Sequence, residues 1–252
     1  EREKLISILK RENQTILEID FPNKLDQKNP KHDFIFVRDQ FISNQRDLVL
    51  ILRSGERLRR VENVVMGDIL NKFNYNIINM PDVPGLRADG GEFYFCVKDN
   101  ILFSGIQRNT LSGINYVVET LKIDELLILD GKGYHLDTFF TPVLNSQNLL
   151  CATIVCDEIL TSKSRKDLYE FSKKRNLPIF KVPLKDSIGT LENIGSFSVN
   201  ALPLPGVLIS PNHFTNKSIE RSLSELGIKR VITPTSQFEL SGGSIHCITN
   251  EL

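Results

Sequence analysis

The alternation of apolar and polar positions follows one plan that recurs about four times along the chain. In residues 206–234, an apolar run is followed by a turn, a segment with helical spacing and a second apolar run. Thr215 is placed to cap the helical segment, and Ile219 and Leu223 share its apolar face. The same order of strand, helix and strand is predicted for residues 48–80, 100–130 and 149–183.

A further short strand is predicted before each of these segments, in residues 34–42, 90–97, 135–143 and 196–204. The chain therefore contains about four ββαβ units, and their spacing of roughly 45 residues is typical of radial or tandem repeats. A fifth unit can be assembled from the two ends. Residues 1–20 predict a helix and a strand, and residues 240–252 predict another strand. Joining the ends would close a ring, which removes exposed sheet edges.

We therefore predict one α/β domain over residues 1–252. The chain begins with Glu1 and not with Met, so we expect an upstream segment, and a first strand is one candidate for what it holds. Acidic and basic residues balance at 31 each, which argues against nucleic-acid and anionic-membrane partners. No apolar run approaches the roughly 18 residues of a membrane-spanning helix. The start does not resemble a signal peptide.

The four cysteines form no CxxC pair, which favours a reduced, cytoplasmic protein. Cys96, Cys151 and Cys156 lie in apolar runs and are expected to be buried hydrophobic residues. Cys247 differs from them, because it follows the polar stretch "SGGSIH".

Polar residues interrupt the apolar pattern in four segments at the starts of predicted strands. They are Asp33, Arg38, Asp39, Asp89, Glu92, His135, Asp137 and Cys247. In a ring of repeated units, equivalent strand ends converge on one central place. We therefore expect several carboxylates, one imidazole and one thiol to share a single pocket.

Such a set suits one kind of chemistry. Carboxylates hold a planar cation by paired hydrogen bonds, and guanidinium is the planar cation whose geometry matches them. A cysteine thiolate is a strong nucleophile for the guanidinium carbon. An imidazole can protonate the departing nitrogen and later activate water. Glycines before Cys247 and after Asp89 allow close approach of the backbone.

Each residue also has an ordinary structural explanation. His135 could be a hydrogen-bonded core histidine, and Cys247 a core cysteine. Asp39 could pair with Arg38 or cap a turn, and Asp89 could serve the turn that its two following glycines indicate. His246 should point to the opposite face of its strand from Cys247, so we interpret it as structural or as a support for a catalytic residue.

The motifs "FVRD", "DGGEF", "HLDT" and "GGSIHC" resemble, in order, those of the guanidino-group-modifying enzymes. This superfamily includes arginine deiminases, dimethylarginine dimethylaminohydrolases, agmatine deiminases and amidinotransferases. The resemblance extends over nearly the whole chain from about residue 30. It implies the pentein fold, a five-bladed α/β propeller of ββαβ units around a pseudo-fivefold axis.

The resemblance also implies roles for individual residues. Cys247 would be the nucleophile, His135 the acid and base, and Asp89 a carboxylate that grips the guanidinium. The residues expected to bind substrate are Asp39, Asp137, Arg108, Arg59 and Asp33. Attack by Cys247 would give a thiouronium intermediate, and water would then release a ureido product. Neither a metal nor an organic cofactor is implied.

Departures from the individual family patterns bear on the substrate. Dimethylarginine hydrolases typically lack the aspartate of "HLD", so Asp137 favours unmethylated nitrogens that have hydrogens to donate. We expect a hydrolase of arginine or a close derivative. An amidinotransferase that uses an amine acceptor is the first alternative, and a non-catalytic binding protein of the same fold is the second. A homodimer is left open.

Overall fold

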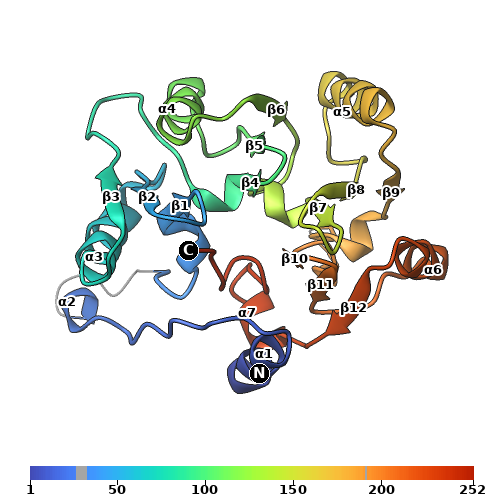
Figure 1. Cartoon of the computed structure of the whole chain (residues 1–252), viewed down its shortest axis with the longest axis horizontal. Coiled ribbons are helices and arrows are strands. Elements are labelled where there is room, and N and C mark those ends of the chain that lie inside the picture. The colour runs from blue at the N-terminus through green and yellow to red at the C-terminus, as the bar shows by residue number, and fades with distance from the viewer. Residues whose placement is uncertain (27–32, 191) are drawn as a thin grey trace.

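Four three-stranded sheets surround a common centre (Figure 1). They belong to a computed structural model of the chain, which describes all residues except 27–32 and 191. The first sheet contains β1 (Phe41–Ser43), β2 (Leu48–Ile51) and β3 (Asn76–Asn79), and the second contains β4 (Phe93–Cys96), β5 (Ile101–Gly105) and β6 (Glu125–Leu129). The third contains β7 (Phe140–Leu144), β8 (Leu150–Val155) and β9 (Ile179–Lys181), and the fourth contains β10 (Leu202–Leu204), β11 (Val207–Ser210) and β12 (Lys229–Ile232).

Every sheet has the same topology. Its first strand pairs antiparallel with its second, and its second pairs parallel with its third. A parallel pair needs a crossover connection, and a helix on the outer side of each sheet provides it (Figure 1). These helices are α3 (Arg60–Leu70), α4 (Leu111–Leu121), α5 (Ser162–Arg175) and α6 (Lys217–Glu225). The four predicted ββαβ units are therefore confirmed.

Local sequence explains where these helices begin. Thr110 and Thr161 cap α4 and α5, because their side chains accept hydrogen bonds from backbone N–H groups three residues later. The prediction that Thr215 caps α6 is wrong. The cap is Asn216, whose side chain accepts from the backbone N–H of Ser218. The Thr215 hydroxyl instead donates to a buried carboxylate, that of Asp186, at 3.0 Å.

The fifth sector of the ring contains helices and irregular chain. The N-terminal α1 (Arg2–Arg11) lies beside the short α7 (Ser236–Glu239) and the C-terminal segment (Figure 1). The carboxylate of Glu1 accepts hydrogen bonds from Ser236, so the start of α1 is tied to α7. The strands predicted at the ends are wrong, since residues 14–20 and 240–252 contain none. A five-bladed propeller thus stays a prediction beyond the four described sheets.

The C-terminal segment is irregular because its backbone groups bond in turns and with the neighbouring unit. The N–H of Ile248 donates to the carbonyl of Ser244, and the carbonyl of Cys247 accepts from the N–H of Arg38 at 3.2 Å. The hydroxyl of Ser43 donates to the carbonyl of Glu251. These bonds dock the segment against the start of the first unit instead of pairing it into a sheet.

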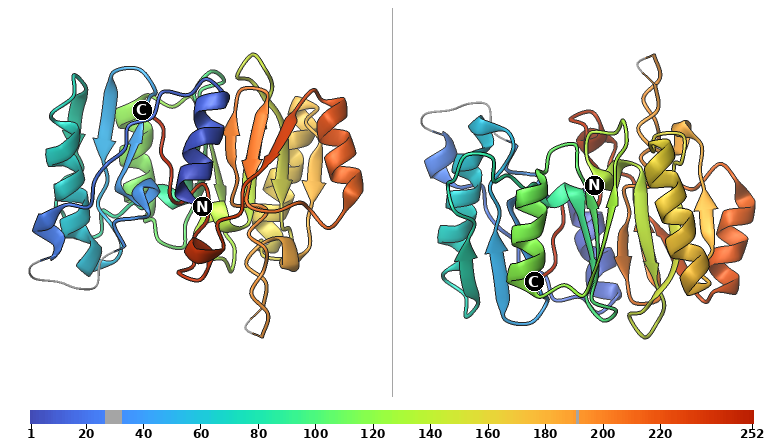
Figure 2. Two further views of the ribbon diagram at one scale, coloured as in Figure 1. Left: turned by 90° about the horizontal axis from the view of Figure 1, so that it is seen from below. Right: turned by 90° about the horizontal axis from the view of Figure 1, so that it is seen from above.

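The remaining short elements are mostly 3-10 turns. They are α2 (Asn23–Asp26), η1 (Val37–Gln40), η2 (Arg57–Arg59), η3 (Gly90–Glu92), η4 (Leu136–Thr138) and η5 (Leu184–Asp186). Of these, η1 and η3 lead directly into the first strand of a unit, and η4 ends two positions before the first residue of β7. The turn η3 packs against both η1 and η4. Side views show that strands and helices run along the central axis (Figure 2).

The buried core extends from one sheet to the next around the ring. The inner strand β7 packs against β4 on one side and β10 on the other, and the rings of Phe103 and Phe140 meet at 4.8 Å between centroids. Cys96 and Cys156 are buried as expected, whereas Cys151 is only partly buried. No helix in the described ranges has the length and apolar character that a membrane crossing demands.

Candidate active site

The turns at the strand starts bring the predicted polar residues together at the centre of the ring. Asp39 lies in η1, and Asp89 lies directly before η3. Asp137 lies in η4, and His135 lies directly before it. Cys247 lies in the irregular C-terminal segment. All five side chains are buried. Short distances join His135 to Asp39 and Asp89, and Cys247 to Asp137, and the charges of His135 and Asp39 act on Asp137.

His135 stands between two carboxylates. Its Nδ1 lies 3.6 Å from Asp39 Oδ1, and its Nε2 lies 3.5 Å from Asp89 Oδ2. Burial alone would lower the pKa of His135, but Asp39 and Asp89 outweigh it and raise this pKa to about 9. For Asp89, burial is likewise outweighed by the interaction with His135, which lowers its pKa. The imidazole is therefore a cation at neutral pH.

Asp137 is fully buried and uses its two oxygens differently. Its Oδ2 lies 2.8 Å from His246 Nδ1 and 3.4 Å from Cys247 Sγ. Its Oδ1 has no hydrogen-bond partner among the described residues. Burial, which disfavours the charge, is the main reason that the pKa of Asp137 is raised to about 7, and the charge of Asp39 adds to the effect.

The nucleophile candidate Cys247 is a thiol in this environment. Burial, followed by the negative charges of Asp137 and Asp39, raises the pKa of its thiol well above the usual value. The amide Nδ2 of Asn200 donates to Sγ at 3.1 Å, which supports a negative charge on the sulfur once it forms. A cation brought to this site would favour the thiolate for the same electrostatic reason that the carboxylates oppose it.

Asn200 is a site residue that the sequence interpretation missed. Its side chain is completely buried and makes four hydrogen bonds at the site. Nδ2 donates to Sγ of Cys247 and to the carbonyl of Asp137, and Oδ1 accepts from the N–H groups of His246 and Cys247. A signal existed, since Asn200 stands two residues before β10 just as Asp39 stands two residues before β1.

Arg59 is held among carboxylates. Its Nη1 donates to Asp39 Oδ2 at 2.5 Å, and Nε and Nη2 donate to Glu62 Oε2 at 3.1 and 3.0 Å. A further bond from Nη2 reaches the carbonyl of Asp33. Arg59 thus fixes Asp39, and its predicted contact with a substrate stays a prediction.

Asp33 lies apart from the central carboxylates. Its side chain is 59% exposed, and its nearest charged partner is Arg59 at 4.0 Å. The alternative in which Arg38 pairs with Asp39 is wrong. Arg38 is buried and pairs with Glu251, with Nη2 and Oε1 3.0 Å apart. Its Nε also donates to the carbonyl of His246, so Arg38 fixes the segment that carries the thiol.

Arg108 lies over a partly exposed aromatic ring next to the site. Its guanidinium carbon is 4.1 Å from the centroid of Tyr134, the residue before His135. The buried carboxylate of Glu92 accepts hydrogen bonds from the backbone N–H of Arg108 at 2.7 Å and from the backbone N–H of Leu136 at 2.9 Å. Glu92 therefore ties together the two loops that carry Arg108 and His135. Burial raises the pKa of Glu92.

Glycine is required where the turns approach each other. A Cβ atom at Gly91 would lie 2.6 Å from His135 Nδ1 and 2.8 Å from Asp39 Oδ1. A Cβ atom at Gly90 would lie 1.9 Å from the carbonyl oxygen of Arg38. The "DGG" motif is thus explained by space at the point where η3 meets η1 and His135.

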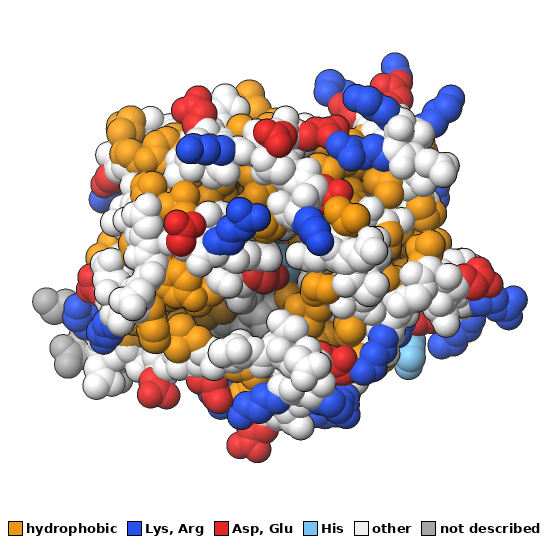
Figure 3. All heavy atoms as spheres, viewed as in Figure 1, with side chains coloured by type: hydrophobic (Ala, Val, Ile, Leu, Met, Phe, Trp, Pro, Cys, Tyr) orange, Lys and Arg blue, Asp and Glu red, His pale blue; other side chains and the backbone are white. Residues whose placement is uncertain are grey.

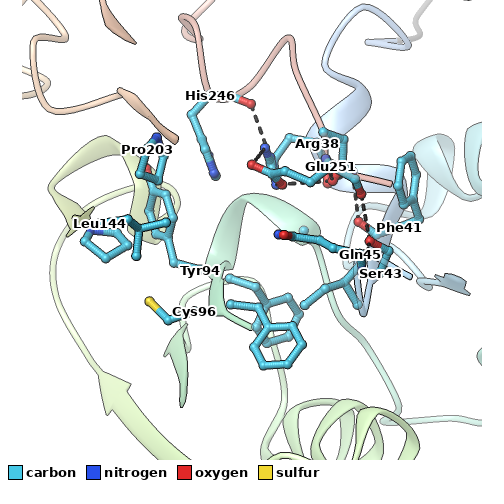
Figure 4. Close-up of a pocket in the computed structure, with 16 residues that line it drawn as sticks. Arg38, Phe41, Ser43, Gln45, Tyr94, Cys96, Leu144, Pro203, His246 and Glu251 are labelled. Atoms are coloured by element: carbon cyan, nitrogen blue, oxygen red, sulfur yellow. Dashed lines mark hydrogen bonds and ion pairs between the residues drawn. The ribbon is translucent and has the colours of Figure 1, made fainter. Parts of the chain in front are cut away.

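A pocket adjoins this cluster beside Tyr94 and His246 (Figure 4). It is also lined by Arg38, Gln45 and Glu251, and the close-up shows the Arg38–Glu251 pair across the pocket from Leu144. The face turned to the viewer in Figure 1 is hollowed near its centre (Figure 3). His246 separates this pocket from Asp137, to which its Nδ1 is bonded.

No protein-family model matches the chain, and no curated protein matches it in sequence. Several solved structures match it in three dimensions. AgrE, in a ternary complex with ornithine and NAD+, has a TM-score of 0.78 at 22% identity, over 98% of this chain and 33% of its own. ArgZ, an arginine dihydrolase from the ornithine–ammonia cycle in Cyanobacteria, has a TM-score of 0.78 at 21% identity, over 98% of this chain and 36% of its own.

A dimethylarginine dimethylaminohydrolase, in an adduct with 4-chloro-2-hydroxymethylpyridine, has a TM-score of 0.64 at 17% identity. The match covers 87% of this chain and 79% of that enzyme. The chain shares the pentein fold of these proteins. It spans about a third of the length of AgrE and ArgZ. The fold implied by the sequence motifs is thereby confirmed at the level of an α/β pentein architecture.

Proposed function

We propose that the protein is a cysteine-dependent hydrolase that attacks the guanidinium carbon of arginine or a close derivative. One observation carries this proposal. Asp137 keeps a buried carboxylate oxygen without a partner among the described residues, and its other oxygen lies 3.4 Å from Cys247 Sγ. A buried carboxylate oxygen needs a donor, and a guanidinium offers planar N–H groups beside its electrophilic carbon.

The charges of the cluster fit such a substrate. Asp39, Asp89 and Asp137 supply three carboxylates. The cations beside them are His135 and Arg59, and Arg59 is paired with Asp39. A guanidinium would offset the negative charge that raises the pKa of the Cys247 thiol. Substrate binding would therefore promote the thiolate that attacks it.

The reaction follows in two halves. As the guanidinium binds, the Cys247 thiol releases its proton to solvent, and the resulting thiolate attacks the guanidinium carbon. The protonated His135 then gives its proton to the departing nitrogen. This leaves a thiouronium on the sulfur and a neutral imidazole. The imidazole then removes a proton from water as water attacks the same carbon. The sulfur departs, and a ureido product is released.

Two features favour arginine, one over its dimethylated form and the other over agmatine, which has no carboxylate. The unpartnered oxygen of Asp137 is suited to an N–H donor, which a fully methylated nitrogen lacks. Arg108, held over Tyr134 at the edge of the cluster, would offer a charge to the substrate carboxylate. We therefore infer L-arginine as the first substrate to test, ahead of agmatine and asymmetric dimethylarginine.

The test is mass spectrometry of products after incubation with each of these three guanidines, with Cys247→Ser as the control. A ureido product from one of them, absent with the variant, supports the proposal and identifies the substrate. A parallel incubation with added glycine detects transfer of the amidino group to an amine. Absence of any product in all incubations would contradict the proposal and revive a binding role for the fold.

A further inference from the structure

His246 is the residue directly before the candidate nucleophile Cys247, and its side chain bonds to Asp137. Its imidazole bonds to Asp137 through Nδ1, at 2.8 Å from Oδ2, and lies over the ring of Tyr94 with centroids 4.1 Å apart and an interplanar angle of 30°. Figure 4 shows the ring projecting from the C-terminal segment toward the pocket that Tyr94 also lines. The ring is therefore bonded to Oδ2 and not to Oδ1, which has no partner among the described residues.

The position of this ring is fixed from three directions. The backbone N–H of His246 donates to Asn200 Oδ1 at 3.0 Å, and its carbonyl accepts from Arg38 Nε at 3.2 Å. The aromatic face is covered by Tyr94. Only 1% of the residue is exposed, so the imidazole has no freedom to leave Asp137.

The bond between His246 and Asp137 leaves the two oxygens of the Asp137 carboxylate in different environments. Oδ2 is occupied by His246 and lies near Cys247 Sγ, whereas Oδ1 stays without a partner among the described residues. We propose that His246 is a positioning residue that anchors Asp137 by Oδ2 and so presents Oδ1 to an N–H group of a planar cation. The inference rests on the proposed function, because the cation is its substrate.

The charge state of His246 suits this task. Burial, followed by the positive charges of Arg38 and His135, lowers the pKa of His246 well below its usual value. A neutral imidazole donates one hydrogen bond and does not cancel the charge of Asp137. An imidazolium in its place would compete with the substrate cation for that charge. The charged and titratable groups that face Asp137 are Arg38, Asp39, Tyr94, His135, His246 and Cys247.

Replacement of His246 can separate its hydrogen bond from its bulk. Asparagine places an N–H where Nδ1 stands, and glutamine places its N–H where Nε2 stands. Leucine keeps bulk and donates nothing. His246→Asn should therefore retain the anchor, while His246→Gln and His246→Leu should lose it. If the leucine variant is too unstable to purify, the glutamine variant still provides the comparison.

The experiment measures alkylation of Cys247 by two reagents at pH 7.5, with Cys247→Ser as the blank. Chloroacetamidine carries a planar cation, whereas iodoacetamide is neutral and does not need Asp137. The ratio of the two rates reports recognition of the cation and is insensitive to a general loss of thiol reactivity. We expect His246→Asn to keep this ratio within about threefold of the unsubstituted protein, and His246→Gln and His246→Leu to lower it about tenfold or more, in line with a lost charge-assisted hydrogen bond.

Two outcomes would overturn the inference while leaving the proposed function intact. One is an unchanged ratio in the glutamine and leucine variants, and the other is an equal loss in the asparagine variant. A different outcome would contradict the proposed function itself. In that case the unsubstituted protein would show no greater preference for chloroacetamidine than free cysteine does.

Discussion

Gly91→Ala should place a methyl group directly against the imidazole of His135. The added Cβ would lie 2.6 Å from Nδ1, whereas ordinary van der Waals contact begins at 3.4 Å, so the ring must retreat by about 0.8 Å. The same atom would lie 2.8 Å from Asp39 Oδ1, which blocks a simple sideways shift. A displacement near 1 Å of a catalytic group costs about 100-fold in rate. That loss corresponds to about 2.7 kcal/mol in the activation barrier.

The assay is kcat/KM for the guanidine that the unsubstituted protein hydrolyses, measured together with the thermal midpoint. Gly67→Ala is the matched control, because its Cβ would meet neighbours only at 3.4 Å and beyond. We expect kcat/KM to fall about 100-fold for Gly91→Ala and to stay unchanged for Gly67→Ala. A Gly91→Ala variant within threefold of the unsubstituted protein would refute the role assigned to His135 and to the "DGG" turn.

Three further predictions concern charge and hydrogen bonding. The value of kcat/KM should rise as pH passes about 7, where Asp137 ionises to hold the cation. It should fall as pH passes about 9, where His135 loses the proton it must donate. A flat profile between about pH 6 and 10, a range that brackets both pKa values, would contradict these roles. Asn200→Asp replaces a donor 3.1 Å from Cys247 Sγ with a carboxylate, so iodoacetamide should alkylate the thiol about tenfold more slowly at pH 8, and an equal or faster rate would count against thiolate support by Asn200. Arg59→Met leaves the carboxylates of Asp39 and Glu62 buried without their cation and should lower the free energy of unfolding in urea by roughly 3–5 kcal/mol; Lys163→Ala, which removes an exposed helical pair, should leave it unchanged, and equal effects of the two variants would argue against a structural role for Arg59.

Repetition made much of this fold predictable. Each unit carries its own strand, helix and turn signals, so the four ββαβ units could be identified from local pattern alone. The ends of the chain were harder. The sequence "GSIHCITNEL" has the composition of a strand, but its backbone bonds to η1 and in turns, and these tertiary partners are not written in local sequence.

In the candidate site, too, some residues could be predicted from the sequence pattern and others depend on tertiary contacts. Asp39, Asp89, His135, Asp137 and Cys247 could be placed together, because repeated strand starts converge in a ring. Asn200 was overlooked because a lone asparagine in an apolar run resembles an ordinary polar substitution. Its role depends on hydrogen bonds to Asp137, His246 and Cys247, which lie outside its own ββαβ unit.

The position of His246 was predicted only in part. Alternation along a strand placed its ring on the opposite face from Cys247, but the segment is not a strand, and both side chains reach Oδ2 of Asp137. Its bond to Asp137 could not be foreseen, because it joins residues 109 positions apart in the chain. Long-range contacts of this kind depend on how the units pack and not on the pattern within any one of them.

Acid-quenched protein mass spectrometry during turnover of L-arginine tests the central claim most directly. The proposed route predicts a covalent adduct on the peptide that contains Cys247, which accumulates while substrate is present and disappears once it is consumed. Cys247→Ser should form neither adduct nor ureido product. Turnover that continues in Cys247→Ser, with no adduct on the unsubstituted protein, would contradict Cys247 as the nucleophile.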